Sequence, residues 1–62
     1  MAHILDASLR HRNFDAQRAE MALKQMKRLE RLDLSHNDIE RPPRLPSSLI
    51  SLNLSHNPRC QQ

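Results

Sequence analysis

The chain has 62 residues, a formal net charge of +3 at pH 7, one cysteine and no glycine. A chain of this length buries only about 60% of its unfolded surface, so one small unit with a thin core is expected. The absence of glycine excludes the glycine-rich loops that hold phosphates and the nucleophile elbow of hydrolases. No apolar stretch approaches the ~20 residues that a membrane-spanning helix needs. We therefore expect a non-catalytic protein without a cofactor and without a membrane partner.

The first predicted element is a short strand near the N-terminus. Its residues follow the spacing of a clearer motif twenty-five residues further along the chain: Ile4, Ala7, Leu9 and Phe14 match Leu29, Leu32, Leu34 and Ile39. Ala7 is small for a core position, and Arg12 stands where the later copies have asparagine. A one-residue bulge would bring Asn13 into that place. A short capping helix over residues 4–11 is the alternative.

Residues 15–27 are predicted to form an amphipathic helix. Apolar residues recur there at helical spacing, and polar residues occupy the other side. The apolar positions are Ala19, Ala22, Leu23 and Met26. Asn13 or Asp15 can cap the start of this helix, because both side chains accept hydrogen bonds from the free amides of a first turn.

Two closely similar segments follow the helix. Residues 29–37 read LERLDLSHN, and residues 49–57 read LISLNLSHN. The two leucines of each LxL point the same way from an extended backbone, since strand side chains alternate. An asparagine amide both donates and accepts, so it can serve several buried backbone groups of a turn. The positions predicted to hold the repeat together are Leu29, Leu32, Leu34, Asn37, Ile39, Leu49, Leu52, Leu54 and Asn57.

The stretch between the two copies, residues 41–48, contains three prolines within five residues. Proline disfavours helix and favours extended, polyproline-like backbone. We expect Pro42 and Pro43 to face solvent and Leu45 to turn inward.

The LxxLxLxxN pattern, extended by Ile39, resembles the leucine-rich repeat family. The proline-rich phrasing is similar to short repeats of bacterial leucine-rich effectors and of small leucine-rich proteoglycans. The motif of residues 29–37 recurs twenty residues later, and self-similarity at such a period indicates a solenoid. The resemblance implies an α/β fold: a leucine-rich repeat solenoid fragment with a small parallel sheet of two or three strands and one outer helix near residues 15–27. It divides a single unit, 1–62, into a degenerate repeat (4–28), a repeat (29–48) and a partial repeat (49–62).

The last predicted coil has no apolar cover. Arg59 stands where Ile39 stands in the preceding copy, so the apolar frame fails there. About three repeats are the minimum for an independent solenoid, and terminal coils normally need polar caps. We therefore expect a chain of marginal stability that is completed by a partner, belongs to a longer array, or works as an oligomer or in a larger assembly.

The resemblance implies that function lies on the concave face of the sheet. Aligning the three copies predicts four rows of residues there: Asp6, Arg31 and Ser51; Ser8, Asp33 and Asn53; Arg10, Ser35 and Ser55; His11, His36 and His56. The rows lack aromatic anchors, so a partner held by them alone would bind weakly. Three histidines suggest a metal site or a switch near pH 6. Neighbouring coils lie about 4.8 Å apart, so three histidines in a row span roughly 10 Å. That span is too long for one zinc ion, so no metal is predicted.

A second candidate surface is a basic flank, made of Lys24, Lys27, Arg28, Arg41 and Arg44. Such a run is typical of a solvated face, or of a contact with an acidic protein or a nucleic-acid backbone. No aromatic residue interleaves with these cations, so specific reading of single strands is not expected. Two functions stay open: a protein-protein interaction or scaffold module, and a basic structural subunit of a ribonucleoprotein that contacts the RNA backbone.

The cellular location is expected to be intracellular. The N-terminus lacks the hydrophobic stretch of a secretory signal, and a lone Cys60 favours a reducing compartment. Arginines within Met1–Lys27 faintly resemble a mitochondrial presequence, which the acidic residues there argue against. The expectation is cytoplasmic, with mitochondrial as the alternative.

Overall fold

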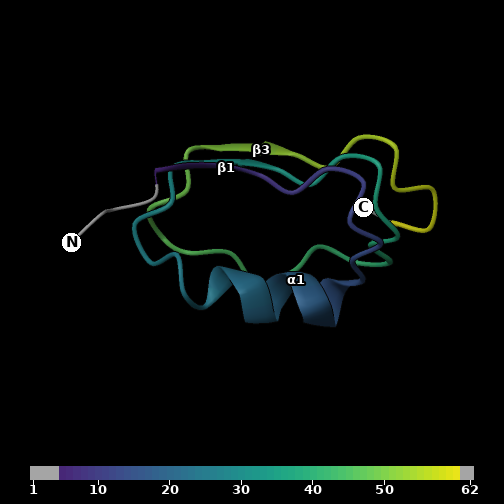
Figure 1. The fold of residues 1–62 in the computed structure, drawn as a ribbon, viewed down its shortest axis with the longest axis horizontal. Helices are drawn as coiled ribbons and strands as arrows, with labels where there is room; N and C mark the ends of the chain where they lie inside the picture. Colours follow the sequence, from purple (N-terminus) through teal and green to yellow (C-terminus); the bar gives the residue numbers. More distant parts are fainter. Residues whose placement is uncertain (1–4, 61–62) are drawn as a thin grey trace.

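The computed structural model describes residues 5–60, which form three stacked coils (Figure 1). We call them coil 1 (5–28), coil 2 (29–48) and coil 3 (49–60). Each coil contributes one strand to a parallel sheet of order β1-β2-β3: β1 (Asp6–Ser8), β2 (Arg31–Asp33) and β3 (Ser51–Asn53). The only helix among the described residues, α1 (Ala16–Leu23), lies on the side of the coils opposite the sheet (Figure 1). It is too short to cross a bilayer.

The register of the sheet is the one that the repeat alignment predicts. Leu32 pairs with Ala7 on one side and with Leu52 on the other. Coil 1 therefore enters the sheet as a strand, and the alternative of a capping helix is wrong. Ile4, the first predicted position of that repeat, lies outside the described residues.

The core is an aliphatic spine centred on coil 2. Leu29, Leu34 and Ile39 are fully buried, and α1 covers them with Ala16, Ala19 and Leu23. The leucines of coil 3 belong to the same frame but are less covered: Leu49 and Leu54 are half-buried and Leu52 is 36% exposed. The reason is positional, because within residues 5–60 coil 3 has a neighbour on one side only.

Two asparagine amides join the coils. Asn37 makes five hydrogen bonds, with Oδ1 accepting from two amides of coil 1 and Nδ2 donating to three carbonyls. These partners are Arg12 N, Phe14 N, Leu9 O, Leu34 O and Ser35 O, at 2.9–3.2 Å. Asn57 repeats the pattern between coils 3 and 2, with Ile39 N, Leu34 O, Leu54 O and Ser55 O.

The predicted bulge at Asn13 does not form. Asn13 is exposed, with a left-handed backbone (φ 55°). The backbone groups of coil 1 are served instead by Asn37 from the next coil. An arginine at position 12 is therefore tolerated, because its backbone amide is used rather than its side chain.

The outer helix is shorter than predicted: α1 ends at Leu23, and residues 24–28 are not helical. Asp15 caps its start by accepting a hydrogen bond from the Arg18 amide at 2.8 Å. A helix over residues 15–27 would be about 20 Å long. The eight residues of α1 are about 12 Å long, which is closer to the roughly 10 Å of the three-residue strand on the opposite side of the coil. The chain instead makes a tight turn after α1, in which the amide of Met26 donates a hydrogen bond to the carbonyl of Leu23. It then returns toward the sheet at Leu29.

The return stretch of coil 2, residues 41–48, contains no helix, as predicted. Two details of the prediction are wrong. Pro43 is buried rather than solvent-facing, and Leu45 is 37% exposed rather than turned inward. Pro43 is buried and Pro46 is half-buried, at the three-residue spacing of polyproline backbone, and Leu45 lies between them at the surface.

Candidate functional site

The exposed face of the sheet carries a polar strip, which we define as Asp6, Ser8, Arg31, Asp33, Ser51 and Asn53. The parallel pairing aligns these residues in two rows across the three strands. The strip lines a shallow hollow of about 430 Å³. Its backbone is fixed by the sheet beneath, so the side chains are displayed from a rigid support.

The charges on the strip compensate one another. Arg31 Nη1 lies 3.0 Å from Asp6 Oδ1, and Arg10 Nε lies 3.6 Å from Asp33 Oδ2. More than half of the Arg31 and Asp6 side chains is exposed. Such an exposed pair contributes little to stability. The strip therefore offers hydrogen-bonding groups with little net charge.

Asp33 and Asn53 also shape the turns that follow their strands. The Oδ1 atom of each accepts a hydrogen bond from the amide two residues on, Ser35 or Ser55, at 2.9 Å. Hydrogen bonds from Ser35, through its side chain and its amide, hold the pKa of Asp33 below its ordinary value. The carboxylate is thus kept ionised at the end of β2.

Ser35, one of the predicted concave-face residues, does not reach the surface. It is 2% exposed, whereas the equivalent Ser55 in coil 3 is exposed. Ser35 lies between two neighbouring coils, where the next coil covers it. Sequence alignment treats the two serines alike, because it does not show which coil has a neighbour.

The three predicted histidines stack at the turn beyond the strip. The ring centroids of His11 and His36 are 4.5 Å apart, and those of His36 and His56 are 4.2 Å apart. All three have left-handed backbones, with φ of 57–58°, a conformation in which histidine is enriched among non-glycine residues. Within residues 5–60, no group of three metal-ligating side chains is placed to hold a metal ion.

His36, the middle ring of the stack, resists protonation. Desolvation, then the neighbouring His56 and His11 and then Arg10, lower the pKa of His36, while Asp33 raises it. As the pH falls, His36 therefore takes up its proton in the unfolded chain before it does so in the folded chain. The stability contributed by neutral His36 is present above its ordinary pKa near 6.5 and is lost as the pH falls through the folded value.

We accordingly expect the melting temperature, followed by circular dichroism, to fall as the pH is lowered from 7.5 to 5.5. His36→Asn keeps a residue that tolerates left-handed backbone and should flatten this dependence. The control His36→Ala should destabilise at every pH, because alanine has no polar side chain that supports left-handed backbone by local hydrogen bonding. An unchanged pH dependence in His36→Asn would contradict the assignment. Carboxylates with lowered pKa lose their contributions only at more acidic pH; they are Glu20, Asp33, Asp38 and Glu40.

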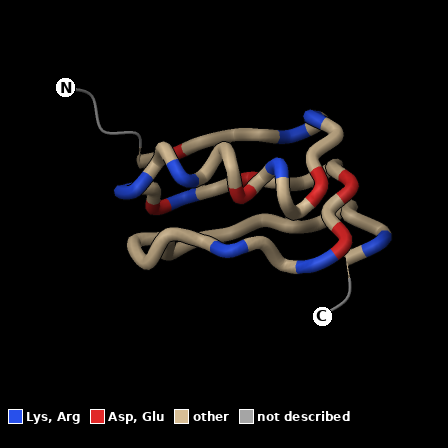
Figure 2. Tube along the Cα trace, turned by 90° about the horizontal axis from the view of Figure 1, so that it is seen from below, with Lys and Arg blue, Asp and Glu red and all other residues tan. Residues whose placement is uncertain are grey.

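The basic flank is divided by the fold. Arg41 Nη1 lies 3.0 Å from Glu20 Oε2, so its charge is compensated. Lys24, Lys27 and Arg44 line a hollow between α1 and the return stretch, and Arg28 does not. Figure 2 views the molecule from the helix side and shows both signs of charge along the outer segments.

Glu20 is a positioning residue that the sequence did not reveal. It holds the return stretch to α1 through Arg41 and through the amide of Arg44, at 2.9 Å. These hydrogen bonds lower the pKa of Glu20. Its partners are more than twenty residues away, so no local spacing signals the contact.

Stacked coils, a parallel sheet and amides that bond from coil to coil define a leucine-rich solenoid. The Leucine Rich Repeat family model matches residues 28–49. Over 31 residues, which are 50% of this chain, the sequence is 61% identical to Toll-like receptor 9 of Mus musculus. That match spans 3% of the receptor's length. No solved structure matches. The chain is thus similar to leucine-rich repeat proteins over residues 28–49.

Proposed function

We propose that this chain is a non-catalytic protein-interaction module that docks on another protein through the polar strip. The similarity to the leucine-rich repeat family supports a protein partner. The observation that carries the proposal is the exposed, charge-compensated strip on a rigid three-stranded sheet. A compensated strip favours a polar protein surface over a polyanion, since phosphates would need uncompensated cations.

The same observations indicate that the strip does not act alone. It is small and has no aromatic anchor, so the strip by itself supports only weak binding. Coil 3 leaves Leu52 exposed beside Ser51 and Asn53 at the edge of the sheet. We infer that the partner, or further coils of a longer array, covers this edge and adds apolar contact area to the polar contacts.

Site-specific crosslinking tests the proposal. A photoreactive amino acid replaces Ser51 on the strip or, as a control, the exposed Gln17 on α1. We expect one protein to be captured repeatedly from position 51 and not from position 17. In a binding assay with that protein purified, Arg31→Glu should weaken binding, because it removes the cation that faces Asp6.

Two outcomes would reject the proposal. Identical adducts from positions 51 and 17 would show that capture does not depend on the strip. Recovery of RNA in place of protein would favour the ribonucleoprotein alternative. A loss of affinity of about 10³-fold or more between 50 and 200 mM salt would point the same way, because it indicates several phosphate contacts.

A further inference from the structure

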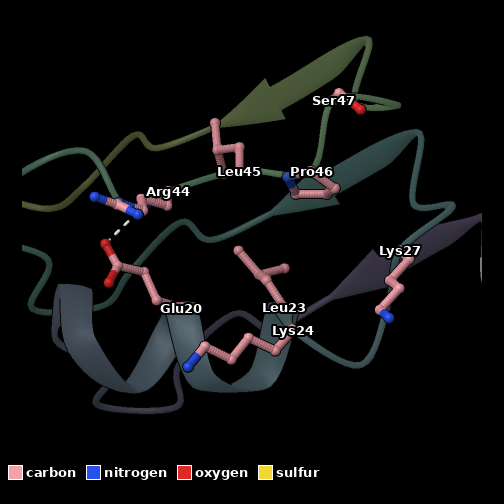
Figure 3. A pocket seen from close by; sticks show the side chains of 8 residues that line it. All are labelled: Glu20, Leu23, Lys24, Lys27, Arg44, Leu45, Pro46 and Ser47. Atoms are coloured by element: carbon pink, nitrogen blue, oxygen red, sulfur yellow. Dashed lines mark hydrogen bonds between the residues drawn. The ribbon is translucent and has the colours of Figure 1, made fainter.

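A second hollow lies on the other side of the molecule, between α1 and the return stretch. Leu23 points from the helix toward Leu45 and Pro46, and these three residues form an apolar floor (Figure 3). The hollow has a volume of about 420 Å³, within the range of about 300–1,000 Å³ that is typical of ligand sites. We call it the outer groove.

The outer groove is held open by contacts at both ends. At one end Glu20 accepts hydrogen bonds from Arg41 and from the amide of Arg44. At the other end the Ser48 hydroxyl donates to the carbonyl of Leu29 at 2.7 Å, with Lys27 O at 3.2 Å. Proline-fixed backbone lies between the two ends. A ligand would meet a preformed site, which lowers the ordering cost of binding.

The rim of the outer groove is basic. Lys24, Lys27 and Arg44 line it and are exposed. Within residues 5–60, none of these three side chains forms an ion pair with a carboxylate. The one carboxylate of the lining, Glu20, is paired with Arg41. The rim therefore presents an excess of positive charge around an apolar floor.

We propose that the outer groove docks an acidic peptide segment in which carboxylates flank one large apolar side chain. The apolar side chain fills the space over Leu23 and Leu45, and the carboxylates pair with Lys24, Lys27 and Arg44. A nucleic-acid backbone matches the charge but leaves the aliphatic floor unused, and the lining has no aromatic residue on which a base stacks. This site is separate from the polar strip, so it does not rest on the function proposed above.

Nuclear magnetic resonance with the full ¹⁵N-labelled chain tests the proposal. The probe is the peptide Glu-Asp-Leu-Asp-Glu, compared with Glu-Asp-Ser-Asp-Glu and with a ten-nucleotide oligouridylate. We expect saturable shifts at the amides of Lys24, Lys27, Leu45 and Ser47 with the leucine peptide, and much weaker binding of the serine peptide. Shifts confined to the strip, at Arg31 and Ser51, would reject the outer groove as the site.

A matched pair of variants separates the groove from general charge attraction. Lys27→Glu and Arg28→Glu make the same change in net charge at adjacent, exposed positions, but only Lys27 lines the groove. Lys27→Glu should weaken the leucine peptide about tenfold, which corresponds to about 1.4 kcal/mol, and Arg28→Glu should have little effect. Leu45→Ser should weaken it similarly by removing part of the floor.

Equal weakening by Lys27→Glu and Arg28→Glu would overturn the proposal, because it would show non-specific attraction. Tighter binding of the oligouridylate than of the leucine peptide would also overturn it, in favour of a nucleic-acid contact. Absence of saturable binding by the leucine peptide would reject it outright.

Discussion

Replacing Asn37 by leucine should abolish cooperative folding of the whole chain. The substitution removes the partner of two backbone amides in coil 1 and of three carbonyls. Each buried group left unsatisfied costs about 1–3 kcal/mol, so we expect a loss of about 3 kcal/mol or more. The total stability expected of 62 residues is itself only about 3–9 kcal/mol. Thermal unfolding followed by circular dichroism should lose its sigmoidal transition.

The equivalent substitution in coil 3, Asn57→Leu, should have a more local effect. Asn57 makes four hydrogen bonds, all of them to groups of coils 2 and 3. Coil 3 should therefore detach while coils 1 and 2 remain paired. Hydrogen exchange distinguishes the two cases at the Leu9 amide, which donates to Asp33 O at 2.8 Å. The protection of this amide from exchange should survive in Asn57→Leu and disappear in Asn37→Leu. The reverse result would contradict the role of the two asparagine amides in joining the coils.

Leu34→Ala should be the most destabilising truncation of the spine. Leu34 is fully buried in coil 2, at the level where coils 1 and 3 both pack. Truncation of a buried leucine costs about 2–5 kcal/mol, and each kcal/mol lowers the melting temperature of a small domain by about 4–8 °C. We expect a decrease of about 10 °C or more in a thermal melt.

Leu52→Ala is the matched control for this prediction. It removes the same atoms from the LxL pair of coil 3, where the side chain is 36% exposed. Less surface returns to water and less of a cavity is left. Its effect should be less than half of that of Leu34→Ala. Equal decreases would mean that coil 3 is covered in solution as fully as coil 2, for example by self-association.

Much of the fold followed from the repeat itself. The alignment of Leu34 with Leu54 predicted parallel strands in register, and the two asparagines predicted amides that serve buried backbone groups. The proline-rich return stretch was predicted to be extended because proline forbids a helix there. These features are local or strictly periodic, so they can be read without knowing what packs on what.

The candidate site was predicted less completely. The rows of the strip followed from the alignment, but the burial of Ser35 did not, because it depends on which coil has a neighbour. The end of α1 at Leu23 was missed, since helical periodicity continued to Met26 while the geometry of the coil demanded an earlier turn. Asn13 was given a role that Asn37 performs from the next coil.

The repeat, its strand register and the aliphatic spine follow from the amino-acid sequence alone, because a period in the chain becomes a period in space once the coils stack. The division of the basic flank, the lower burial of coil 3 and the position of the outer groove follow only from the way the coils fold against one another. These features depend on contacts such as Glu20 with Arg41 and Leu23 beside Leu45, between residues about twenty positions apart. No local pattern encodes such contacts, because their geometry is set by the stacking of whole coils.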